Sequence, residues 1–232
     1  MARRIGLAVG VTVVISLATP GLAVITAGAV KRSTYVVQAA SVAEARSAVD
    51  GVGGRVGLAL PIVDGVEAEL NPSQFRALHA RHAVGVTPDV GMHFLGSSFG
   101  AGDQTPQLAR MDVNGLWSPS AGQGVGVALI DTGVAMTPGI PRSHLVVGPN
   151  FSSSADNLDR YGHGTFMAGL IAGHATQAAG SVPGVAPGAT LVSVKVAGDD
   201  GSTTLGQVIQ GIGWAVANRA RYGIRVLSIS FG

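Results

Sequence analysis

Asp131 and His163 have the side chains of this sequence that are best placed for acid–base chemistry. Asp131 follows the apolar residues 128–130 and precedes Thr132 and Gly133, a pattern typical of a carboxylate that leaves a buried strand and enters a turn. In parallel sheets, the working residues lie just past the carboxyl ends of strands. An aspartate at such a place more often only caps the turn, so a functional interpretation needs a partner.

The partner is His163, in the tract YGHGTFMAGLIAG at residues 161–173. Gly162 and Gly164 remove side chains on both sides of the imidazole, which leaves room for a substrate and for a carboxylate. Thr165 is placed to cap a helix that begins here. Small residues further along the tract allow a second backbone to approach that helix: Ala168, Gly169, Ala172 and Gly173. We expect Asp131 and His163 to reach the same edge of one cleft.

Three apolar runs are predicted to form the sheet that positions these residues: 125–130, 190–194 and 224–229. Between the last two, apolar residues recur at helical spacing over 205–216, and Thr203 or Thr204 could cap that helix. Apolar strands that alternate with helices indicate a parallel sheet covered on both faces. The predicted class is therefore α/β, with the last run expected to be buried on both faces.

Residues 34–91 predict a smaller α+β unit. The expected order is a strand at 35–38, a helix at 42–49 ended by glycines at 51–54, two strands of which the second is 66–70, a helix from Asn71, and a strand at 84–86. Asn71, Pro72 and Gln74 predict a capping box with proline at the first helical position. This βαββαβ order is the split βαβ arrangement.

Residues 92–104, MHFLGSSFGAGDQ, have no sustained period and are rich in Gly and Ser. We interpret them as an exposed connector, and therefore as a processing region.

The first residues have the pattern of a secretory signal peptide. Arg3 and Arg4 precede an uncharged apolar stretch, which is broken at Pro20 and ends in the small residues 27–29. We expect cleavage after residue 29 and export of the remainder. The alternative is an uncleaved membrane anchor, because the apolar stretch is long enough to span a bilayer.

Composition excludes several function classes. Without residues 1–29, the Lys+Arg count falls from 15 to 13, which equals the 13 Asp+Glu residues. A neutral chain without a basic cluster is not expected to bind nucleic acid. The chain has no cysteine, which excludes disulfides and thiolate metal sites, and we expect no cofactor.

Three blocks of the chain resemble those of subtilisin-like serine proteases, in that family's order: ALIDTGV around Asp131, GHGTFMAG around His163, and the final VLSISFG. The tract GVAPGATLVSVKVAGDDGS also matches the family. The resemblance covers about residues 104–232, so that 105–232 is interpreted as the N-terminal part of a catalytic domain. Residues 34–91 resemble the family's inhibitory pro-domain, which would act as an intramolecular inhibitor.

The resemblance implies an endopeptidase that acts on polypeptides through an Asp-His-Ser triad. His163 would be the general base, and Asp131 would hold its tautomer and stabilise the imidazolium. Two segments would pair with an extended substrate backbone: Gly201 with Ser202, and Ser230 with Phe231 and Gly232. Phe231 would line an apolar substrate pocket, although an aromatic residue at a strand end is as often ordinary core.

The sequence departs from the family in two places. Where many members carry an aspartate that binds calcium, residues 137–140 have no carboxylate, so we expect no calcium there. No Gly-Thr-Ser-x-Ala block is present either, so the serine and the oxyanion asparagine are missing. We expect the chain to be a fragment of a longer zymogen and inactive by itself.

Competing interpretations remain. An aspartic protease also uses Asp-Thr-Gly, but it needs two such carboxylates, and this chain has one. A nucleotide site at glycines 122–126 fails, because the G-x-G-x-x-G register is broken and these glycines precede the strand. The non-enzyme alternative is an inactive, protease-derived binding or inhibitory module.

Overall fold

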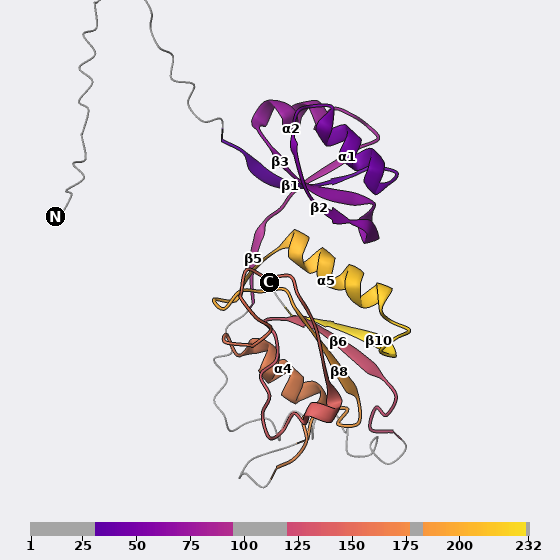
Figure 1. Ribbon diagram of the computed structural model, residues 1–232, viewed down its shortest axis with the longest axis vertical. Coiled ribbons are helices and arrows are strands. Elements are labelled where there is room, and N and C mark those ends of the chain that lie inside the picture. The colour runs from indigo at the N-terminus through magenta and orange to yellow at the C-terminus, as the bar shows by residue number, and fades with distance from the viewer. Residues whose placement is uncertain (1–30, 95–119, 177–182, 231–232) are drawn as a thin grey trace, which may run out of the picture. The chain divides into compact units, whose positions relative to one another are not determined.

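The computed structural model describes residues 31–94, 120–176 and 183–230, and the first of these ranges contains a four-stranded sheet with two helices (Figure 1). Its elements are β1 (Ser33–Gln38), α1 (Val42–Asp50), β2 (Arg55–Leu60), the 3-10 turn η1 (Pro61–Val63), β3 (Gly65–Leu70), α2 (Pro72–His79) and β4 (Gly85–Pro88). The strand order is β2-β3-β1-β4, and every pair is antiparallel. The predicted βαββαβ order is confirmed.

Helix α2 begins as the sequence predicts. The side-chain oxygen of Asn71 accepts hydrogen bonds from the amides of Ser73 and Gln74, each at 2.9 Å. The side chain of Gln74 in turn accepts from the Asn71 amide at 2.9 Å. This capping box satisfies amides that the first turn of a helix leaves free, and the fully buried Leu78 holds the helix on the sheet.

The larger sheet is parallel, with the strand order β10-β6-β8-β7. Its strands are β6 (Gly126–Asp131), β7 (Leu145–Asn150, after the 3-10 turn η3, Arg142–His144), β8 (Thr190–Lys195) and β10 (Ile224–Ile229). The sequence predicts three of these strands but not β7. That strand has a single buried residue, Leu145, and includes Gly148 and Pro149, so its apolar run is too weak to stand out.

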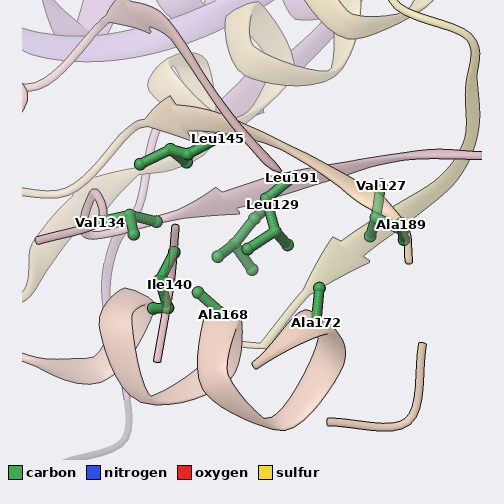
Figure 2. Packing of buried hydrophobic residues seen from close by; sticks show 9 residues of the cluster. All are labelled: Val127, Leu129, Val134, Ile140, Leu145, Ala168, Ala172, Ala189 and Leu191. Carbon is green, nitrogen blue, oxygen red and sulfur yellow. The ribbon is translucent and has the colours of Figure 1, made fainter. Parts of the chain in front are cut away.

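Helices α4 (His163–Ala172) and α5 (Leu205–Ala217) cover opposite faces of this sheet (Figure 1). One set of strand residues packs with α4 (Figure 2): Val127, Leu129 and Leu191 with Ala168 and Ala172. The alternate set packs with α5: Ala128, Ile130, Val192 and Val194 with Val208 and Ala215. Each fully buried valine, leucine or isoleucine side chain contributes roughly 1.5–3 kcal/mol. The predicted coverage of both faces is confirmed, and so is the Thr204 cap of α5.

Strand β10 is more exposed than its sequence predicts. Val226 exposes 48% of its surface, and Leu227 and Ile229 each expose 38%. In the described part of the chain, β10 is the end strand and pairs with β6 alone. The expectation of a strand buried on both faces is therefore wrong for these residues.

A second, two-stranded sheet pairs β5 (Gly91–His93) with β9 (Ser202–Thr204) in antiparallel register, with Met92 opposite Thr203. The region predicted to be an exposed connector therefore begins with a paired strand, and Phe94 is only 1% exposed. The remainder of that region, 95–104, lies outside the described residues.

The predicted signal peptide, residues 1–29, also lies outside the described residues. Within the described ranges, no helix combines the length and the apolar character needed to cross a bilayer.

Candidate active site

Asp131 ends β6 and is fully buried. Its Oδ1 atom accepts a hydrogen bond from the amide of Thr132 and is paired with Nδ1 of His163, each at 2.7 Å. Its Oδ2 atom has no donor among the described residues. The structure thus brings together the aspartate and the histidine that the sequence singles out, at the carboxyl end of a parallel strand.

His163 is the first residue of α4, and only 6% of it is exposed. Gly162 precedes the helix with a φ of 97°, in the region that favours glycine. Gly164 is required for a different reason. A Cβ there would overlap the carbonyl oxygen of Gly133 and lie 3.1 Å from Asp131 Oδ1. At Gly164, the predicted room is taken by the Asp131 carboxylate, as expected, and by the turn that follows it, which leaves none for a substrate.

We expect Gly164→Ala to lower the free energy of unfolding by about 1–3 kcal/mol, because a backbone carbonyl cannot move aside as a flexible side chain would. Urea unfolding measures this change. Gly169→Ala is the matched control on the same helix, since an added Cβ meets nothing within 4 Å. It should stabilise the protein by roughly 0.4–1 kcal/mol. Equal stabilities of the two variants would contradict the close approach of the Gly133 turn.

The first turn of α4 is held by Asp159, which no local sequence pattern marks. Its carboxylate accepts from the amides of Gly162 and Thr165, each at 2.7 Å, and from the Thr165 hydroxyl at 2.6 Å. The prediction that Thr165 caps the helix is wrong, because Thr165 lies inside the first turn and Asp159 takes the amides that a cap would satisfy.

The two groups of the pair have shifted pKa values. Burial raises the pKa of Asp131, although the hydrogen bonds from His163 and Thr132 oppose this rise. The hydrogen bond with Asp131 raises the pKa of His163, and the charges of Asp131 and Asp159 raise it further against the effect of burial. A higher pKa makes the imidazole a stronger base.

Strand β5 leads directly to Phe94, whose ring lies beside His163. The ring centroids of Phe94 and His163 are 5.3 Å apart. The Phe94 amide donates to the carbonyl of Gly201 at 3.0 Å, and the Phe94 carbonyl accepts from the Tyr161 hydroxyl at 2.9 Å. Both backbone groups of Phe94 are therefore bound next to the imidazole.

Two of the predicted substrate-binding residues, Gly201 and Ser202, lie along this strand. Gly201 is buried with a φ of 80°, and Ser202 is opposite His93 in the β5–β9 ladder. Ser230 directly follows β10 and is half-buried. Phe231 and Gly232 lie outside the described residues. Of the two predicted substrate segments, therefore, only Gly201 with Ser202 is observed next to an extended strand, which is β5.

Lys195, at the end of β8, is a second buried polar residue that the sequence pattern does not mark. Its Nζ atom donates to the carbonyls of Thr132 at 2.6 Å and Leu158 at 3.2 Å, and it lies 3.5 Å from the Asp199 carboxylate. Lys195 therefore ties the turn after Asp131 to the loop before α4.

No three histidine, cysteine, aspartate or glutamate side chains gather into a possible metal site in the ranges that the structure describes. The absence of calcium near residues 137–140 stays a prediction.

The pairing with Asp131 fixes the orientation of the His163 ring, so that the imidazole can act as a base. Because Nδ1 of His163 is paired with Asp131, Nε2 is the ring nitrogen that can exchange a proton with a reacting group. The carboxylate is positioned to stabilise the imidazolium that forms when the ring takes that proton.

Known proteins resemble this chain in sequence. The model of the Subtilase family matches residues 122–232. An alkaline protease of Alkalihalobacillus alcalophilus is 32% identical over 72% of this chain and 41% of its own length. A thermostable alkaline protease of Halalkalibacterium halodurans is 40% identical over 48% of this chain and 28% of its own length. Mycosin-4 of Mycobacterium tuberculosis is 35% identical over 58% of this chain and 30% of its own length. The chain spans less than half the length of these curated relatives.

Solved structures resemble it in fold. Fervidolysin from Fervidobacterium pennivorans, a keratinolytic enzyme related to subtilisin, aligns with a TM-score of 0.61 at 20% identity, over 90% of this chain and 37% of that one. The epidermin leader peptide processing serine protease of Staphylococcus aureus aligns with a TM-score of 0.61 at 17% identity, over 87% of this chain and 50% of that one. At identities this low, the similarity shows the fold alone. The predicted subtilisin-like α/β fold is confirmed.

Proposed function

We propose that the protein is a serine endopeptidase that hydrolyses polypeptides with an Asp-His-Ser triad, because the Subtilase family model matches residues 122–232. His163 takes the proton of the serine and returns it to the leaving amine, while Asp131 holds the tautomer that has a proton on Nδ1. The observation that carries this proposal is the 2.7 Å contact between His163 Nδ1 and Asp131 Oδ1 at a buried strand end.

The proposal places the serine outside these residues. The sequence has no Gly-Thr-Ser-x-Ala block, and its matches cover less than half of the relatives named above. The 232 residues alone then have a base and an orienting acid but no nucleophile, so activity belongs to the full-length protein.

The proposal includes export and self-inhibition. Residues 1–29 act as the signal peptide, and residues 34–91 act as an inhibitor-like pro-domain whose trailing strand occupies the cleft. In support, β5 pairs with β9, and Phe94 lies on His163. A chain bound in this way excludes another extended polypeptide from the same ladder.

Two carboxylates add to this docking at the first turn of α5. Asp89 Oδ1 accepts from the amide of Gly206 at 3.0 Å, and the Glu67 carboxylate lies against the Cα of the same glycine. Negative charge is favourable at a helix N-terminus. Burial, and then the charge of Asp89, raise the pKa of Glu67.

An aspartic protease is less consistent with the site. That mechanism needs two carboxylates that share a proton. Asp131 is instead paired with a histidine, and the nearby Asp159 is occupied by donors from Thr132, Gly162 and Thr165.

We expect the full-length protein to process itself at the Leu95–Gly96 bond. The Phe94 amide is bound to Gly201 and the Phe94 carbonyl to Tyr161, so that carbonyl is already occupied. The next carbonyl along the chain is that of Leu95. Mass spectrometry of the mature protein should find a new N-terminus at Gly96, and a first cut at another bond would contradict this register.

Inhibitors identify the chemistry independently of the cleavage position. Casein hydrolysis by the processed protein should stop with a serine-directed phosphonate and continue with pepstatin. The reverse pattern would favour the aspartic protease.

A further inference from the structure

Asp159 carries a buried carboxylate whose acceptor positions are all directed at one small part of the site. The residue is 8% exposed. Its Oδ1 atom accepts from the Thr132 hydroxyl at 2.8 Å and from the Gly162 amide at 2.7 Å. Its Oδ2 atom accepts from the amide of Thr165 at 2.7 Å and from its hydroxyl at 2.6 Å. One carboxylate thus binds the turn after Asp131 and the first turn of α4 together.

The two threonines extend this connection in both directions. The Thr132 hydroxyl, which donates to Asp159, accepts from the amide of Gly164 at 2.9 Å. The Thr165 hydroxyl accepts from the amide of Ala135 at 2.8 Å. Thr132 and Gly164 are the residues that directly follow Asp131 and His163 in the chain, so this network fixes the separation of the pair.

We propose that Asp159 is a positioning residue for the Asp131–His163 pair, one that locks the strand-end turn to the helix N-terminus and so sets the distance and orientation of the two side chains. Its catalytic consequence rests on the proposed function. Asp159 acts through Thr132, Gly162 and Thr165.

The hydrogen-bond inventory requires a carboxylate here and not an amide. Each oxygen of Asp159 faces a backbone N–H group, that of Gly162 on one side and that of Thr165 on the other. An asparagine has one acceptor oxygen and one NH₂ group. In either orientation its NH₂ would face a backbone donor that cannot rotate away, and a buried donor would lose its partner.

The influence of Asp159 on His163 can be measured through the pKa of the imidazole, which depends on the charges around it. Asp131 at the end of β6 and Asp159 in the loop before α4 both raise the pKa of the imidazole. Lys195 of β8 is directed to the carbonyls of Thr132 and Leu158, and Arg160 pairs with Asp156 and Asp199. From β5, the apolar ring of Phe94 packs on the imidazole, and the side chain of the neighbouring His93 is exposed. Loss of the Asp159 charge should therefore lower the pKa of His163.

The test compares Asp159→Asn with Asp156→Asn in the full-length protein. Asp156 lies in the same loop but is exposed and paired with Arg160, so its replacement removes an equal charge without touching the network. With ¹⁵N-labelled histidine, NMR should show a lower pKa of His163 in Asp159→Asn and an unchanged one in Asp156→Asn. Steady-state kinetics should show kcat reduced about 10–100-fold in Asp159→Asn with KM little changed.

Thr132→Val serves as a second variant if Asp159→Asn does not fold. It keeps the Asp159 charge and removes the hydroxyl that joins the two turns. The kcat should therefore fall, while the Asp159 charge should still raise the pKa of His163. A wild-type kcat in folded Asp159→Asn or in Thr132→Val would overturn the proposal, as would an unchanged His163 pKa in folded Asp159→Asn. The NMR titration needs no turnover, so it tests the network even if the protein is not a protease.

Discussion

His163→Ala should reduce the turnover of polypeptide substrates by the full-length protein about 10⁶-fold, the size of loss expected when a triad loses its base. Asp131 cannot replace the imidazole, because it is buried behind it. Asp159 cannot do so either, since its oxygens already accept bonds from Thr132, Gly162 and Thr165. The Leu95–Gly96 bond should also stay intact, because the same base serves processing.

The measurement is kcat/KM with a fluorogenic peptide, together with the mass of the purified protein. His82→Ala is the matched control, since His82 is exposed in the turn after α2. It should process and turn over normally. Processing that continues in purified His163→Ala protein would show that another protease makes the cut, and undiminished peptide turnover would remove His163 from the mechanism.

Local patterns predict much of this fold because its core is built from them. The apolar runs of β6 and β8 alternate between the α4 face and the α5 face, so each of these strands has a nearly continuous apolar sequence. The Asn71 and Thr204 caps have the side-chain spacing that their helices need. The meeting of Asp131 and His163 follows from strand ends that share one edge of a sheet.

The remaining features depend on contacts between distant segments. Strand β5 pairs with β9 through backbone groups, and this pairing does not depend on particular side chains. The sequence around Phe94 therefore gives no sign of it and resembles a Gly/Ser-rich connector. Asp159 lies in a loop without periodicity, and its role appears only when Thr132 and Thr165 approach it from two elements. The close approach of the Gly133 carbonyl to Gly164 has no local signature for the same reason, since that carbonyl belongs to the turn after another strand.

Asp131→Asn should lower kcat about 10⁴-fold in the full-length protein, on the precedent of the same change in other triads. Oδ1 of Asp131 serves both Thr132 and His163, so the carbonyl oxygen of an asparagine could take this place and keep both bonds. The NH₂ group would then occupy the position of Oδ2, which has no donor among the described residues. Geometry is thus largely retained. The loss then comes from the missing negative charge that stabilises the imidazolium and, where the NH₂ group turns toward Nδ1, from the tautomer with its proton on Nε2.

The pH dependence of kcat/KM tests this charge effect. His163 must be neutral to act as a base, so activity falls as the pH drops through its pKa. Since the bond to Asp131 and then its charge raise that pKa, Asp131→Asn should move the acid limb of the profile to lower pH, by more than Asp159→Asn does. An acid limb that stays in place would contradict the charge effect, because asparagine removes the negative charge whichever way its amide group is turned.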